Sequence, residues 1–160
     1  MRGVNVTELG RLEGFRVGSV RPLLITVFDQ TATVERLTLL DTLQGRFITR
    51  NPKMYALNVI IGVAVQQPEP AVREKAAALQ QKYDAANVAA VTVLAVKGLG
   101  AVLARGFLAA LALVSGGSKP TQVFKTLAEA VTWLRGLPNA PAALKALEVS
   151  EVEAFVAGVK

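Results

Sequence analysis

The feature that most constrains this chain is an almost purely apolar run from Tyr55 to Val65, which reads YALNVIIGVAV. It is rich in β-branched side chains and is bounded by Pro52 and Pro68. β-Branched residues favour strands, and a strand with apolar side chains at successive positions must be covered on both faces. The run therefore predicts a strand in the centre of a sheet.

Other strand patterns alternate with helical ones along the chain. Two strands joined by a tight connection are expected within 12–28, a third at 88–96 and a short one at 122–125. Between them, apolar residues recur at intervals of three and four, the period of an amphipathic helix. This order predicts an α/β fold with a central mixed, mostly parallel sheet of four or five strands flanked by helices.

Capping residues indicate where the helices begin. Thr31 or Thr33 is placed to cap the first helix, and Pro70 suits the first turn of the next one. Thr126 and Glu129 have the spacing of a capping box, in which each residue satisfies a backbone N–H of the other. We expect a helix to begin there and to end at 135–136.

The composition limits the chemistry available to this chain. It has 160 residues, with 18 Lys and Arg, 12 Asp and Glu, and neither His nor Cys. Without Cys there are no disulfides, zinc ribbons or thiol nucleophiles, and without His the commonest general base and zinc ligand are missing. No carboxylate cluster suited to a metal is visible in the sequence. We expect no metal site, no cofactor and no enzymatic activity.

Residues 85–114 raise the question of a membrane span, because their only charges are Lys97 and Arg105. These two charges leave no uncharged piece as long as the roughly 20 residues that cross a bilayer. A buried strand followed by a buried helix at Leu99–Val114 fits the pattern better. The first ten residues lack the apolar core of a secretory signal, so we expect a cytoplasmic protein without stable membrane insertion.

The formal net charge of +6 invites a nucleic-acid hypothesis. The basic residues are scattered, however, with no run of three. Arg46, Arg50 and Lys53 cluster at the end of a predicted helix, where cations complement the helix dipole. Aromatic residues are not interleaved with the basic ones. We therefore expect a solvated basic face and no nucleic-acid binding.

The segment from Pro70 to Leu134 resembles the STAS-type, SpoIIAA-like proteins, whose domain is shared by anti-sigma-factor antagonists and the cytoplasmic tails of anion transporters. The resemblance lies in a helix (AVREKAAALQQKY), a strand (VAAVTVLAV), an apolar helix (VLARGFLAALALV) and the ending VFKTLAEAVTWL. It implies a STAS-like domain that is not an enzyme and is used in regulation or partner binding.

The resemblance also bears on switching. In the bacterial antagonists, a phosphorylatable Ser or Thr at the start of the helix after the central strand acts as the switch. Here that turn reads Gln66-Gln67-Pro68-Glu69-Pro70 and contains no hydroxyl, so no switch residue is assigned. Distant relatives with a related fold bind lipids in a cavity. This leaves a carrier of a small ligand, a lipid or a nucleotide held between sheet and helices, as the alternative function.

Prolines after Gly136 mark a hinge, so the chain divides into a STAS-like α/β domain at 1–136 and a helical C-terminal extension at 137–160. A predicted capping box, Ser150 to Glu153, begins the last helix. Its apolar stripe follows at helical spacing: Val152, Phe155, Val156 and Val159. We expect this stripe to dock either on its own domain or on a second subunit or partner.

Three residues are candidate ligand contacts. Gly98 and Gly100 lie between a strand and a helix, where backbone N–H groups can meet a pyrophosphate. Leu103 replaces the third glycine of that fingerprint, and two glycines equally suit a tight turn. Arg105 lies in an apolar helix, so its charge must reach solvent, a carboxylate or an anionic ligand.

The most apolar helical segments supply a candidate interaction surface. It consists of Leu99, Leu103, Phe107, Leu111, Val152, Phe155 and Val156. From the sequence we expect a regulatory or protein-interaction module that binds a partner protein, a neutralising or immunity-type role included. We also expect a homodimer through Leu99–Val114, because that helix has more apolar faces than one sheet can cover.

Overall fold

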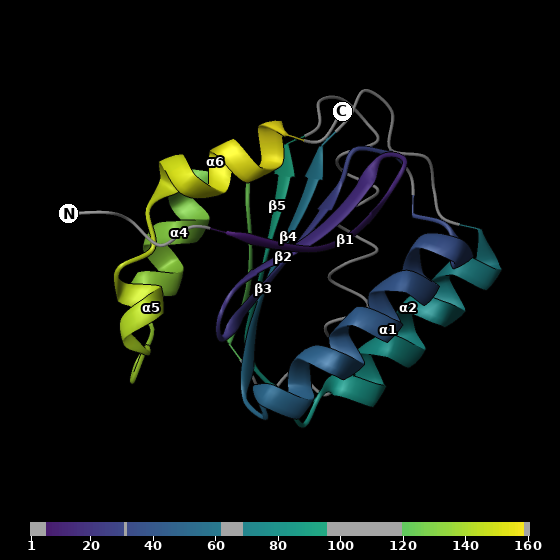
Figure 1. Ribbon diagram of the computed structural model, residues 1–160, viewed down its shortest axis with the longest axis horizontal. Helices are drawn as coiled ribbons and strands as arrows, with labels where there is room; N and C mark the ends of the chain where they lie inside the picture. Colours follow the sequence, from purple (N-terminus) through teal and green to yellow (C-terminus); the bar gives the residue numbers. More distant parts are fainter. Residues whose placement is uncertain (1–5, 31, 62–68, 96–119, 159–160) are drawn as a thin grey trace.

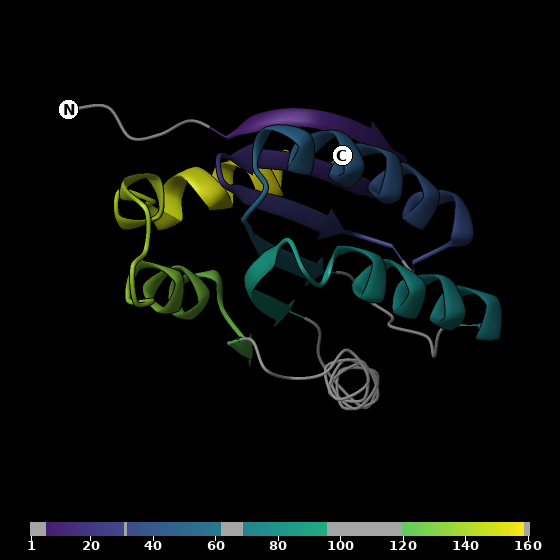
Figure 2. The ribbon, with the colours of Figure 1, turned by 90° about the horizontal axis from the view of Figure 1, so that it is seen from below.

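A computed structural model describes residues 6–30, 32–61, 69–95 and 120–158 of the chain. Within these residues the strands form one six-stranded mixed sheet, in the spatial order β1-β2-β3-β4-β5-β6, with helices on both faces (Figure 1, Figure 2). The α/β class and the mixed sheet flanked by helices are confirmed. The expected number of four or five strands is wrong.

The additional strand is β1 (Thr7–Leu12), the outer strand of an antiparallel meander with β2 (Phe15–Val20) and β3 (Leu23–Phe28). Its sequence, TELGRL, lacks the alternating apolar pattern of a half-buried strand because β1 lies at the edge of the sheet and is mostly exposed. Gly14 forms the turn to β2 with φ +67°, a backbone conformation that favours glycine.

The second part of the sheet is parallel. β3 pairs with β4 (Met54–Ile61), β4 with β5 (Asn87–Ala95) and β5 with β6 (Thr121–Phe124). The central position predicted for the apolar run is thus confirmed, since β4 has a parallel neighbour on each side. The last part of that run, 62–65, lies outside the described residues.

Helices α1 (Val34–Arg50) and α2 (Pro70–Tyr83) lie side by side on one face of the sheet (Figure 2). The Thr33 hydroxyl accepts a hydrogen bond from the Arg36 backbone N–H at 3.1 Å, which confirms Thr33 as the cap, and Pro70 is in the first turn of α2. Residues of α1 and of the sheet below it form one buried cluster: Phe15, Val17, Leu24, Leu43, Phe47, Met54 and Ala56.

The opposite face is covered by α4 (Leu127–Arg135), α5 (Ala142–Lys145) and α6 (Val149–Ala157) (Figure 2). The Thr126 hydroxyl accepts a hydrogen bond from the Glu129 N–H at 3.2 Å and contacts the Glu129 carboxylate at 3.0 Å. Together with the cap at Gly136, this confirms the predicted limits of α4.

The C-terminal tail docks on its own chain. Leu144, Leu147 and Val152 are fully buried, and they share one hydrophobic core with residues of β3, β4, β5 and α4. The predicted capping box at Ser150 is wrong. Glu148, two residues before Ser150, is in the cap position without a side-chain cap bond, and helix α6 begins at Val149, so Ser150 lies inside the first turn.

A buried cation joins α6 to the meander. Arg16 of β2 is only 6% exposed, and its guanidinium carbon lies 4.8 Å from the centre of the Phe155 ring. Its Nη1 lies 3.3 Å from the Glu8 carboxylate of β1. On the same sheet face, Gly18 meets Phe155 so closely that an added Cβ would lie 2.5 Å from the ring.

We therefore predict that Gly18→Ala weakens the docking of α6. The new methyl group would lie 2.5 Å from a ring carbon of Phe155 and 2.8 Å from a methyl carbon of Val6, so Phe155 of α6 and Val6, just before β1, must shift. The expected loss in the free energy of unfolding is about 1–3 kcal/mol, the usual cost of overpacking, measured by urea denaturation.

Gly136→Ala provides the matched control for this variant. There the added Cβ meets its nearest atom, the Thr132 carbonyl oxygen, at 3.5 Å, and the backbone φ of −90° suits alanine. Its free energy of unfolding should stay within about 0.5 kcal/mol of the wild type. Equal stability of Gly18→Ala and wild type would show that α6 does not pack on Gly18 as described.

Candidate functional site

The candidate site is an open hollow of about 450 Å³ between α1 and α2, which we call the α1–α2 groove. It is lined by seven residues: Asp41, Thr42, Gly45, Arg46, Thr49, Lys82 and Tyr83. The α1 residues recur at intervals of three and four, which places them along one side of that helix. Both helices rest on the sheet, so the groove faces away from the sheet core.

Small side chains on α1 create the space. Thr42, Gly45 and Thr49 leave room beside α2 where longer side chains would fill it. A Cβ at Gly45 would lie 3.2 Å from the Tyr83 hydroxyl oxygen, closer than most side-chain contacts. Gly45 therefore allows the end of α2 to approach α1.

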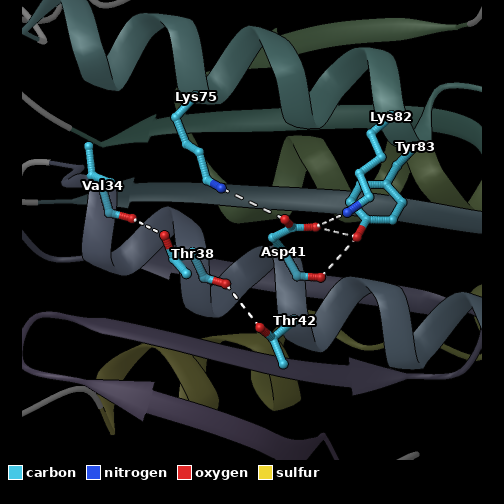
Figure 3. A network of polar contacts seen from close by, with 7 residues as sticks. All are labelled: Val34, Thr38, Asp41, Thr42, Lys75, Lys82 and Tyr83. Carbon is cyan, nitrogen blue, oxygen red and sulfur yellow. Dashed lines mark hydrogen bonds and ion pairs between the residues drawn. The ribbon is translucent and has the colours of Figure 1, made fainter.

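Asp41 links the two helices (Figure 3). The Tyr83 hydroxyl donates to the Asp41 backbone carbonyl oxygen at 2.9 Å and also lies within hydrogen-bond distance of its carboxylate Oδ1. Lys82 Nζ donates to the same Oδ1 at 2.9 Å, and Lys75 Nζ lies 3.8 Å from Oδ2. The carboxylate is therefore neutralised by groups of α2.

Burial distinguishes the members of this network. Tyr83 is 4% exposed, so its hydrogen bonds are protected from water, whereas the Lys82 side chain is 58% exposed. An exposed ion pair contributes little to stability, because water and salt screen it. We conclude that the hydroxyl of Tyr83 fixes the geometry of the groove, and that Lys82 is placed at its rim.

The network moves each pKa away from neutrality. Hydrogen bonds from Tyr83 and then Lys82 lower the pKa of Asp41 from 3.8. Burial, and then the hydrogen bond to Asp41, raise the pKa of Tyr83 above 10.0. The hydrogen bond to Asp41 raises the pKa of Lys82 above 10.5. At neutral pH Asp41 and Lys82 are therefore charged and Tyr83 is protonated.

The groove can bind a ligand by hydrogen bonds and charge. Arg46 and Lys82 are exposed or half-exposed donors at its rim, and its hydroxyl oxygens are acceptors. Within the described parts of the chain, no group of three or more His, Cys, Asp and Glu side chains is placed to hold a metal ion.

None of the sequence-predicted site residues that the structure describes lines the groove. Seven others fall outside the described residues: Gly98, Leu99, Gly100, Leu103, Arg105, Phe107 and Leu111. Val152 and Phe155 are buried in the core of their own chain, and Val156 is partly buried against it. Packing within one chain thus accounts for these three residues of the predicted apolar stripe, whose fourth member, Val159, lies outside the described residues. Among the described helices, none is long and apolar enough to cross a membrane.

Sequence reasoning missed the groove because its members are distant along the chain. Tyr83 and Asp41 are 42 positions apart, and no local pattern predicts that they meet. Two sequence features could have pointed to the groove. One is the tyrosine that ends the apolar stripe of α2, and the other is the spacing of small residues on α1. Neither specifies which two helices pack together.

Comparisons of this chain with protein-family models, with curated proteins and with solved structures find no match.

The lowered pKa of Asp41 leads to a prediction on acid stability. Because the folded value lies below the ordinary 3.8, this carboxylate stabilises the fold above that pH, and the stabilisation is lost as pH falls through the folded value. Asp41→Asn should therefore unfold more easily at neutral pH. Its free energy of unfolding should also fall less steeply than that of the wild type between about pH 5 and about pH 2.

Asp29→Asn is the control, since Asp29 is an exposed carboxylate in the bend after β3. At neutral pH its free energy of unfolding should stay within about 0.5 kcal/mol of the wild type, as for most surface substitutions. Chemical denaturation at a series of pH values measures all three proteins. Identical slopes for Asp41→Asn and wild type in the acid range would contradict the network.

Tyr83→Phe tests the uncharged part of the same network. The ring keeps its packing, but the hydrogen bonds to Asp41 are lost, so the free energy of unfolding at neutral pH should fall by about 1 kcal/mol. The wild type should lose this advantage as pH rises above 10, because the raised pKa of Tyr83 stabilises the fold only while the hydroxyl is protonated. A variant as stable as the wild type at neutral pH would argue against the bond.

Proposed function

We propose that this protein is a non-enzymatic regulatory module that binds a partner protein through the α1–α2 groove. The observation that carries the proposal is a pair of hydrogen-bonded helices with exposed polar side chains along the hollow between them. Tyr83 and Asp41 hold the two helices together, while Arg46 and Thr49 are exposed along the hollow beside them. A partner can then meet a surface that is already organised, which lowers the entropic cost of binding.

The chemistry of the groove supports binding over catalysis. A general acid or base works best when its pKa lies near the operating pH. In the groove, the pKa of Asp41 is lowered, and those of Tyr83 and Lys82 are raised. These groups keep one protonation state near neutral pH, which suits fixed recognition by charge and hydrogen bonds.

The proposed fold type is STAS-like. Its support is the alternation of parallel strands and helices from β3 onward, together with the sequence pattern between Pro70 and Leu134. The edge strand β1 is an addition to the expected pattern. A homodimer through Leu99–Val114 stays a prediction, because that segment lies outside the described residues.

The test is to obstruct the groove. Thr49→Trp places a large side chain in the hollow, whereas Thr132→Trp places the same side chain at an exposed position of α4, on the other face of the sheet. A partner is first identified by affinity capture from the source cells, and its dissociation constant for each purified variant is then measured by calorimetry. We expect Thr49→Trp to weaken binding at least about tenfold and Thr132→Trp to change it less than about twofold.

Two outcomes would overturn the proposal. Equal affinity of both variants would show that the partner binds away from the groove. A stoichiometric lipid or nucleotide in native mass spectra of freshly purified protein would favour the small-ligand carrier instead. Circular dichroism of both variants establishes that the substitutions leave the fold intact.

A further inference from the structure

We infer that the segment of the partner protein that docks in the α1–α2 groove is an acidic peptide. This inference rests on the proposed function and names the chemistry of the partner. The first argument is charge. Arg46 and Lys82 line the groove and Lys75 stands beside it, and Asp41 is the only carboxylate among the lining residues.

Asp41 offsets only one of these three positive charges. Its carboxylate receives hydrogen bonds from Tyr83 and Lys82 and faces Lys75 across 3.8 Å (Figure 3). Each of these contacts is made within the protein, so Asp41 is already satisfied before a partner arrives. The charge left for recognition is positive, and carboxylates on a partner complement it.

The hydroxyl groups supply the second argument. Thr42 donates its hydroxyl proton to the Thr38 carbonyl oxygen at 3.2 Å, and Thr49 donates to the carbonyl oxygen of Arg46. Tyr83 donates toward Asp41. All three hydroxyls of the groove thus direct their protons at protein acceptors, and their remaining lone pairs can only accept hydrogen bonds.

The groove therefore combines cationic donors with hydroxyl acceptors. An acidic peptide matches both, since its carboxylates accept from Arg46 and Lys82 and its backbone N–H groups donate to threonine oxygens. Inorganic phosphate and the nucleic-acid backbone bring mainly acceptors. The one aromatic ring in the lining, Tyr83, is 4% exposed and gives a base no face on which to stack.

The experiment titrates the whole chain with a short peptide of alternating Glu and Ala, and with the same peptide carrying Gln in place of Glu. Chemical shifts in ¹⁵N–¹H spectra report both affinity and location. We expect the Glu peptide to shift groove resonances and to bind at least about tenfold more tightly than the Gln peptide.

Two charge reversals locate the effect. Arg46→Glu reverses a cation that lines the groove, and Arg73→Glu makes the same change in net charge at an exposed position of α2 that does not line it. We expect Arg46→Glu to lose at least about tenfold in affinity for the Glu peptide and Arg73→Glu less than about threefold.

The inference is overturned if the Glu peptide does not bind, if both reversals act equally, or if inorganic phosphate or a single-stranded oligonucleotide binds the groove more tightly. Its failure is distinguishable from failure of the proposed function. If Thr49→Trp abolishes binding of the partner and Arg46→Glu leaves its affinity unchanged, the groove is the docking surface but the docked segment is not acidic.

Discussion

The structure depends on strands that are apolar on both faces. In β3, Leu23, Ile25 and Val27 face the core shared with the C-terminal helices, while Leu24 faces α1. Neighbouring residues of β4 divide in the same way, with Leu57 on the one side and Ala56 on the other. Such a sheet is stable only if two separate layers exclude water from it. That requirement explains why the tail after Gly136 packs as part of the core.

The groove is a consequence of this two-layer arrangement. Helix α1 is held to the sheet by Leu43 and Phe47, and α2 packs on α1 through residues that include Val72 and Tyr83. Their apolar sides are thereby fixed toward the interior and toward each other. The polar sides come to lie along the outer seam, where Asp41 and Tyr83 bond across it. The position of the groove is therefore determined by apolar packing, and its chemistry by the residues left outside.

The parts of the fold that the sequence predicted are those with a local cause. Thr33, Pro70 and Thr126 act within their own helical turn, so their roles were visible in short patterns. The same reasoning failed at Ser150. A capping pattern does not show which residue takes the cap position, and in α6 that residue is Glu148. Strand β1 was missed because its polar residues give no periodic signal at a sheet edge.

The groove was not predicted because its contacting residues are far apart in the sequence. The same holds for the contact of Arg16 with Phe155. A buried guanidinium is costly unless other groups replace water around it. Arg16 contacts Glu8 on the neighbouring strand and the Phe155 ring on α6, and burial still lowers its pKa.

Its Nη2 nevertheless remains buried without a hydrogen-bond partner among the residues that the structure describes. Phe155 is far from Arg16 in sequence, as Tyr83 is from Asp41, and each pair meets only when the elements that carry it pack together. Polar contacts of this kind depend on which elements pack together. They can therefore be identified in the folded structure but not predicted from local sequence patterns.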